Sequence, residues 1–225
     1  MNTKLAYVRQ TTDACKGYPY PSAAHPYRYG TSGCVYISGC GVCASLMVLR
    51  NLTSKSFTTK EWTKKCISMG ARAMEGTDMG VVAQYLDKNY GIRYSVTSSM
   101  DKLVAHLKKG YKAVLNITGG GKMLFSDSGH YVFAAGIDKN GNLIILDPYW
   151  YSNKFTLTAN RRKYCTVKNE REVYVKPSSL KSDITSIWLF TPTKNVDIRY
   201  SVNDVNYKAP KPKAPNVQAG TYVLT

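Results

Sequence analysis

The pattern of apolar and polar positions predicts helices in the first half of the chain. From Cys40 to about Leu52 the apolar residues fit a buried helix. Thr58 and Glu61 have the spacing of a capping box at the start of another. With this helix, at residues 58–70, two more are expected after the first, within residues 77–91 and 98–110. Residues 1–37, which are rich in Tyr, Pro, Gly and Ser, are expected to form an ordered loop.

The second half has the pattern of an antiparallel sheet. Asn140-Gly141 lies between two apolar runs and is a strong hairpin signal. Helices followed by an antiparallel sheet predict an α+β domain. The expected strands are short runs rich in β-branched and aromatic residues, at 111–118, 129–138, 141–148 and 184–191.

The composition changes again after about residue 194. Residues 195–218 end in KAPKPKAPNVQ, a Lys/Pro sequence that is typical of an extended, semi-rigid linker. Residues 219–225, AGTYVLT, read as the first strand of a further module. We therefore expect one domain over residues 1–194, a linker, and the start of a second, truncated domain.

The chain has 225 residues and a net charge of +17, from 31 basic and 14 acidic residues. Such a charge attracts polyanions, among them nucleic acid, anionic membranes and the anionic polymers of bacterial walls. Nucleic-acid binding usually concentrates basic residues in one patch, but here they are scattered, so we expect no nucleic-acid partner.

No apolar run approaches the roughly 18 residues of a membrane span, and the N-terminus lacks a signal-peptide core. We therefore predict no membrane insertion and six cysteines that stay free thiols.

The segment SGCGVCASLMVL, residues 38–49, carries two cysteines three positions apart. A zinc site commonly takes two spaced ligand pairs, but no second cysteine pair exists and the histidines have no HxxxH spacing. A thioredoxin-like CxxC follows a strand, whereas a long loop precedes this one. A nucleophile fits better, because the dipole at a helix start lowers a cysteine pKa and backbone N–H groups there can face an oxyanion. Cys40, between Gly39 and Gly41, is the candidate, and Cys43 is expected to pack inward.

A cysteine nucleophile needs a base and a residue that orients the base. His130 opens a predicted strand directly after a glycine, where it can project into a cleft. Asp147 ends the next predicted strand, so an antiparallel hairpin can place the two side by side. His25 lies in a Pro/Tyr loop, and His106 is expected on the surface of a helix. A core histidine and a turn-capping aspartate remain the structural alternative for the pair.

These segments resemble papain-like cysteine peptidases of the double-glycine-peptidase-like group. GCGVCASLMVL resembles the nucleophile motif of that group, and GHYVFAAGIDKNGNLIILDPYW resembles its histidine strand, hairpin and terminal Asp-Pro. LAYVRQ, residues 5–10, resembles its N-terminal strand ending in glutamine. The resemblance spans most of residues 5–191, with Val42 and Cys43 as departures and an unusually long loop before the nucleophile. It implies a papain-like fold with Cys40 as nucleophile, His130 as general base, Asp147 as its orienting residue and Gln10 as side-chain oxyanion donor.

The resemblance also implies acyl transfer that needs no metal and no cofactor. Within the group, the basic charge and the Lys/Pro linker make the chain similar to the catalytic domain of a bacteriophage endolysin. Residues 1–194 would then cleave an amide of cell-wall peptidoglycan, and residues 219–225 would begin an SH3-type wall-binding module. We expect a monomer that remains in the host bacterial cytoplasm until a holin gives it access to the wall.

Two other functions remain open at this point. One is an intracellular cysteine peptidase that processes proteins or leader peptides, and the other is a non-catalytic basic module that binds wall or nucleic acid.

Two motifs resemble known binding sites but are better explained by local structure. Asp138, Asn140 and Asn142 mimic a calcium loop but lack its glycine and closing glutamate, so a hairpin turn explains them better. GGGK, residues 119–122, lacks the spacing of a phosphate loop and is expected to be a flexible loop beside the cleft, a candidate lid.

Overall fold

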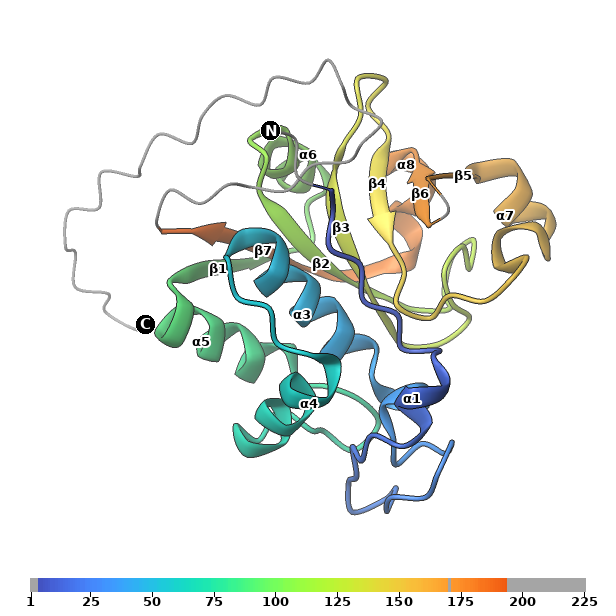
Figure 1. The fold of residues 1–225 in the computed structure, drawn as a ribbon. Coiled ribbons are helices and arrows are strands. Elements are labelled where there is room, and N and C mark those ends of the chain that lie inside the picture. Colours follow the sequence, from blue (N-terminus) through green and yellow to red (C-terminus); the bar gives the residue numbers. More distant parts are fainter. Residues whose placement is uncertain (1–3, 170, 194–225) are drawn as a thin grey trace.

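The computed structural model describes residues 4–169 and 171–193. Within these residues the chain forms an α+β fold in which helices from the N-terminal half pack on a seven-stranded antiparallel sheet (Figure 1). The α+β class predicted from the sequence is confirmed. The predicted linker, 195–218, and the predicted second module, 219–225, lie outside the described residues.

The four helices predicted from periodicity are all present. They are α3 (Cys40–Leu52), α4 (Thr59–Ser68), α5 (Met79–Tyr90) and α6 (Met100–Lys108). Thr58 and Glu61 form the expected capping box of α4. The Asp78 side chain accepts from the first backbone N–H groups of α5, and Gly91 ends that helix at a φ of 63°, in the left-handed region that favours glycine.

All seven strands pair antiparallel, in the order β1-β7-β2-β3-β4-β6-β5. The four predicted strands are β2 (Lys112–Ile117), β3 (His130–Ile137), β4 (Leu143–Leu146) and β7 (Ile184–Pro192). The sequence did not indicate β1 (Ile92–Thr97), β5 (Cys165–Lys168) or β6 (Glu172–Val175). β1 and β5 are the two edge strands, and their largely polar, exposed residues carry little apolar signal.

The central strands are buried on both faces. On one face, Val114 and Phe133 pack in the cluster that contains the apolar residues of α3 and α5. On the other face, Leu115 and Val132 pack with Leu103 and other residues of α6. This two-sided burial explains why β3 and β4 read as nearly continuous apolar runs instead of alternating ones.

The N-terminal segment differs from the expectation at two places. Two short helices, α1 (Asp13–Lys16) and α2 (Val35–Ser38), lie within the predicted loop. Residues 5–9 form no strand, so the expected N-terminal strand is wrong for this chain. The segment is held instead by paired hydrogen bonds between the Ala6 backbone and the Asn51 side chain, both 2.9 Å, which replace a strand ladder.

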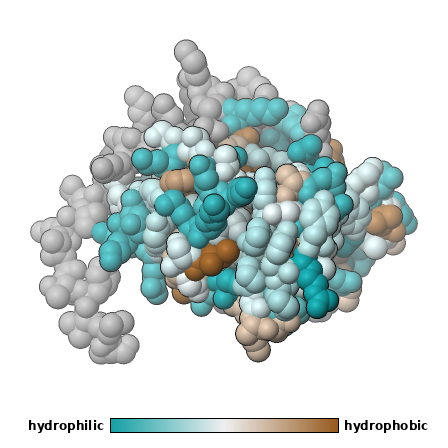
Figure 2. Space-filling model, turned by 60° about the horizontal axis from the view of Figure 1, so that its bottom comes forward, coloured by the Kyte–Doolittle hydropathy of each residue, from teal (hydrophilic) through white to brown (hydrophobic). Residues whose placement is uncertain are grey.

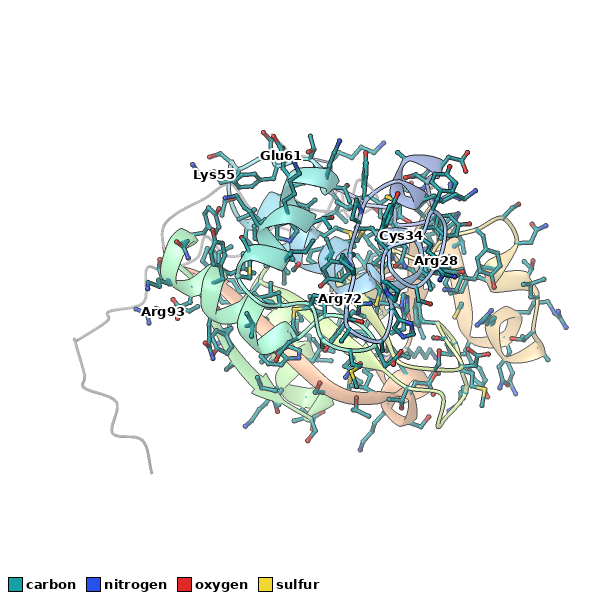
Figure 3. The ribbon with its side chains drawn as sticks, turned by 90° about the horizontal axis from the view of Figure 1, so that it is seen from below. Arg28, Cys34, Lys55, Glu61, Arg72 and Arg93 are labelled. Atoms are coloured by element: carbon teal, nitrogen blue, oxygen red, sulfur yellow. The ribbon has the colours of Figure 1, made fainter. Side chains whose placement is uncertain are left out.

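The long loop before α3 is fastened by Arg72. Its Nε donates to the Tyr20 carbonyl at 2.8 Å and its Nη2 to the Ser32 carbonyl at 3.1 Å, and its guanidinium lies 4.9 Å from the Tyr20 ring centroid. Figure 3 shows Arg72 beside the part of the chain that carries Arg28 and Cys34. One half-buried fork of donors thus ties together segments about 40 to 50 positions apart.

The segments that resemble a calcium loop and a phosphate loop both have structural roles. Asp138 accepts from the backbone of Asn140 at 2.9 Å and of Asn142 at 2.8 Å, which confirms the hairpin turn between β3 and β4. The 119–122 loop is not a free lid, because buried Asp183 accepts from the backbone N–H of Lys122 and, at 3.0 Å, from that of Leu124.

The remaining short elements connect the strands on the far side of the hairpin. They are η1 (Lys154–Thr156), α7 (Ala159–Tyr164), α8 (Pro177–Leu180) and η2 (Lys181–Asp183). Two of them supply anchoring side chains: η1 carries Lys154, and η2 carries Asp183.

We predict that Asp183→Asn lowers the free energy of unfolding by about 1–3 kcal/mol, because an amide N–H would face backbone N–H groups that now have an acceptor. Urea denaturation measures the loss. Asp101→Asn, an exposed change in the first turn of α6, is the control, and an equal effect of the two substitutions would contradict the anchoring role.

Candidate active site

Cys40 is the first residue of α3, directly after the short helix α2 and the single residue Gly39. A Cβ on Gly39 would lie 2.4 Å from the Val35 carbonyl oxygen, and one on Gly41 would lie 2.5 Å from the Thr77 Cβ. No larger residue fits at either position. The Gly-Cys-Gly sequence is therefore a packing requirement that sets the sulfur at the positive end of a 13-residue helix.

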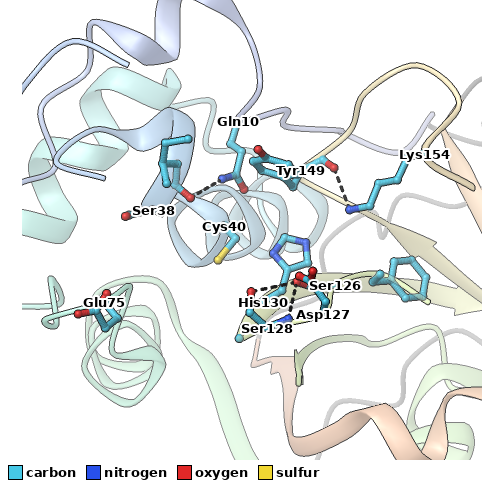
Figure 4. A pocket seen from close by; sticks show the side chains of 13 residues that line it. Gln10, Ser38, Cys40, Glu75, Ser126, Asp127, Ser128, His130, Tyr149 and Lys154 are labelled. Carbon is cyan, nitrogen blue, oxygen red and sulfur yellow. Dashed lines mark hydrogen bonds between the residues drawn. The ribbon is translucent and has the colours of Figure 1, made fainter. Parts of the chain in front are cut away.

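His130 and Asp147 meet across the β3–β4 hairpin. His130 begins β3 and Asp147 directly follows β4, so both lie at the same end of the sheet. The His130 Nε2 is 2.7 Å from the Asp147 Oδ1, and the two side chains are 7% and 0% exposed. With Nε2 committed to Asp147, the Nδ1 nitrogen is left for the hydrogen bond with Cys40. Figure 4 shows Cys40 and His130 bordering one pocket.

The electrostatics of the pair favour a charged cysteine. Burial raises the pKa of the Cys40 thiol, but the hydrogen bond and charge of His130 and the backbone N–H groups of Tyr131 and Gly41 outweigh it, so the pKa lies below its usual range. Burial lowers the pKa of His130, yet the charge and hydrogen bond of Asp147 prevail and raise it to about 9. Both shifts favour a thiolate–imidazolium pair over a neutral one.

Asp147 is completely buried and has partners on both oxygens. Its Oδ1 also accepts from the Tyr149 backbone N–H at 2.9 Å, and its Oδ2 accepts from Lys154 Nζ at 2.6 Å. Burial raises the pKa of Asp147, but the positive charges of Lys154 and His130 bring it below its usual value. Sequence reasoning missed Lys154, although a lone lysine inside the aromatic run YWYSNKF was a signal.

Gln10 lies at the same pocket, 1% exposed, with its backbone N–H bonded to the Pro148 carbonyl at 2.9 Å. Its Nε2 donates to the carbonyls of Tyr36 and Ile37, both at 3.1 Å, while its Oε1 has no hydrogen-bond partner among the described residues. A carboxamide nitrogen has only two hydrogens. To serve an oxyanion, Gln10 must therefore give up one of these two bonds.

The pocket around Cys40 has a volume of about 290 Å³. Besides Gln10, Cys40 and His130, its walls include Glu75 on one side and residues 125–129 on the other, whereas buried Asp147 does not line it. Glu75 and Asp127 are exposed carboxylates at its rim, and the His25 ring lies 2.9 Å from Glu75. These rim residues could not be predicted from the sequence, because they come from loops that only the fold brings together.

The other candidates have different environments. The surface position expected for His106 is wrong: its ring is half-buried against the carbonyls of Lys112 and Phe190, and burial lowers its pKa to about 4. Cys43 packs inward as expected, with its pKa raised by burial. All six cysteines are free. In the described part of the chain, no group of three or more His, Cys, Asp or Glu side chains could hold a metal ion.

The antiparallel sheet, the helix packed on it and the glycine-flanked cysteine at its start define a papain-like cysteine peptidase. The profile of the Peptidase_C39 like family matches residues 4–175, most of the chain, and the protein belongs to this family. Among the described residues, no helix is both long enough and apolar enough to span a bilayer.

Two solved structures are similar. The peptidase domain of Streptococcus ComA, a bi-functional ABC transporter of a quorum sensing pathway, is 15% identical, with a TM-score of 0.44 over 68% of this chain and 90% of that one. UfSP from C. elegans is 16% identical, with a TM-score of 0.37 over 69% of this chain and 30% of that one. No curated protein matches the chain.

We predict that iodoacetamide at pH 6 modifies Cys40 at least about tenfold faster than any other cysteine, because only a lowered pKa leaves thiolate at that pH. The reactivity is lost as the pH falls through the Cys40 pKa. Burial raises the pKa of the thiols of Cys15, Cys43, Cys66 and Cys165. Peptide mass spectrometry follows each site, and equal labelling of all six would contradict the activated thiol.

Proposed function

We propose that this protein is an endolysin-type peptidoglycan hydrolase that cleaves an amide bond of the bacterial cell wall through a Cys40 acyl-enzyme. The observation that carries the proposal is the contact chain from Cys40 through His130 to buried Asp147, at a pocket of a protein whose net charge is +17. The contact chain supports the reaction class, and the charge supports the kind of substrate.

The proposed reaction begins with the Cys40 thiolate attacking the amide carbonyl carbon. The carbonyl oxygen becomes an oxyanion, and the collapse of this intermediate breaks the C–N bond. The imidazolium of His130 gives its proton to the leaving amine. Neutral His130 then takes a proton from water, which attacks the thioester and releases the acid and free Cys40. Asp147 holds the imidazole ring throughout and stabilises its charged form.

Two donors are proposed for the oxyanion. One is the backbone N–H of Cys40, which points out of the first turn of α3, where helix N–H groups have no partner within the helix. The other is the Gln10 side chain, once one of its bonds to the carbonyls of Tyr36 and Ile37 is released. Its unpartnered Oε1 makes that rearrangement less costly, because turning the amide sacrifices no bond at that oxygen.

The charge distribution supports a wall substrate. The walls of Gram-positive bacteria carry anionic polymers, and a strongly basic protein concentrates near them. The face in Figure 2 is mainly hydrophilic, with isolated apolar residues, as suits a polar polymer. The exposed carboxylates of Glu75 and Asp127 at the pocket rim favour a substrate with a nearby amino group, which wall peptides provide.

We predict that the protein, incubated with purified Gram-positive wall, releases fragments with new amino and carboxyl ends while the glycan strands stay intact. Mass spectrometry of the muropeptides identifies the bond. Cys40→Ala is the control, because it removes the nucleophile and leaves the basic surface unchanged. An unaltered wall, or equal release by the Cys40→Ala variant, would sink the proposal.

We predict that Gln10→Ala lowers kcat on the cleaved substrate about 10²-fold, the usual loss for one oxyanion donor. The alkylation rate of Cys40 should stay close to that of the wild type, because Gln10 makes no hydrogen bond to the sulfur or to His130 in this structure. Parallel loss of both rates would show that Gln10 supports the thiolate instead of the oxyanion.

A further inference from the structure

Lys154 is a buried cation in the wall of the pocket that the proposed reaction leaves without a role. Its side chain is 3% exposed, and its Nζ donates to Asp147 Oδ2 at 2.6 Å and to the Tyr149 carbonyl at 3.0 Å. Lysines are almost never buried unless they are paired, because removing the ammonium from water is costly. A buried lysine within one contact of the histidine–aspartate pair therefore calls for an explanation.

The contacts of Asp147 show what this lysine does to its geometry. His130 Nε2 and the Tyr149 backbone N–H bind Oδ1, whereas Lys154 binds the opposite oxygen, Oδ2. Donors on both oxygens fix the plane of the carboxylate, so that Oδ1 stays directed at the imidazole. Without Lys154, only Oδ1 would hold the carboxylate in place.

The charges at the site balance only when Lys154 is included. In the reactive state Cys40 and Asp147 are negative, and His130 and Lys154 are positive. Without the lysine this buried group would carry a net negative charge, which opposes formation of the Cys40 thiolate. Burial lowers the pKa of Lys154, the charge and hydrogen bond of Asp147 oppose this lowering, and the attraction between Cys40 and Lys154 opposes it more weakly.

We propose that Lys154 is a positioning residue of the catalytic site, which fixes the Asp147 carboxylate and supplies the balancing charge that lets the Cys40 thiolate form near neutral pH. The proposal rests on the proposed roles of Cys40, His130 and Asp147. It does not depend on which amide the protein cleaves.

Other charged and titratable groups also face Lys154. Arg161 of α7 donates to the Lys154 carbonyl at 3.3 Å and adds a positive charge, and Asp127 borders the same pocket. The rings of Tyr149 and Tyr151 lie 5.4 and 5.8 Å from Nζ. None of the side chains of Arg161, Asp127, Tyr149 and Tyr151 bonds to the Asp147 carboxylate, whereas that of Lys154 does, so removing the Lys154 side chain should have an effect that removing theirs does not share.

The test is the alkylation rate of Cys40 against pH in Lys154→Gln and Lys154→Arg. Glutamine can still donate to Asp147 but has no charge, whereas arginine keeps the charge. The acid limb of the profile is the pH range in which the alkylation rate falls because the Cys40 thiolate is protonated. Removing a positive charge raises the proton affinity of every nearby group, so this limb should move up by about one pH unit in Lys154→Gln. The alkylation rate at pH 6 should fall about tenfold, and Lys154→Arg should retain the wild-type limb.

The control is Lys122→Gln, which removes a positive charge from a neighbouring surface pocket and should leave the limb unmoved. If Lys154→Gln does not fold, Lys154→Met replaces it, since methionine packs against the surrounding aromatic rings. A folded Lys154→Gln or Lys154→Met variant with the wild-type limb overturns the proposal. A wild-type Cys40 without any reactivity at low pH overturns the proposed catalytic role, and this inference falls with it.

Discussion

The site depends on the close packing of the backbone around the start of α3. A side chain at position 39 would meet the carbonyl of Val35, and one at position 41 would meet Thr77, so the backbone can approach only with glycine at both. This close packing places the Cys40 sulfur at the positive end of the helix and against His130 of β3. The reactivity that we propose for the thiol thus depends on how closely a helix lies on a sheet.

The second requirement is electrostatic: the buried charges at this end of the sheet are stabilised because oppositely charged side chains bond to one another. Asp147 has no exposed surface, and it keeps its negative charge because donors approach both of its oxygens. That charge holds the pKa of His130 high, and the resulting imidazolium lowers the pKa of Cys40. Each step depends on the previous one, so a change far from the sulfur can still alter its chemistry.

Much of this arrangement could be predicted from the sequence. The helices with clear caps and the central strands β2, β3 and β4 left strong apolar patterns, and the hairpin at Asn140-Gly141 brought His130 and Asp147 within reach of each other. The polar edge strands β1 and β5 left no such pattern, because their stability comes from pairing with neighbours and not from burial. Lys154 was missed for a different reason: the aromatic residues around it hint at burial, but the contact with Asp147 that explains a buried lysine appears only in the fold.

The pH titration of the Cys40 thiolate tests the central claim most directly. The ultraviolet absorbance of thiolate is measured against pH in the wild-type protein, and the same curve from Cys40→Ser is subtracted. The account predicts a midpoint clearly below the ordinary cysteine pKa of about 8.5, and loss of this low midpoint in His130→Ala. A wild-type midpoint at or above that value would contradict it.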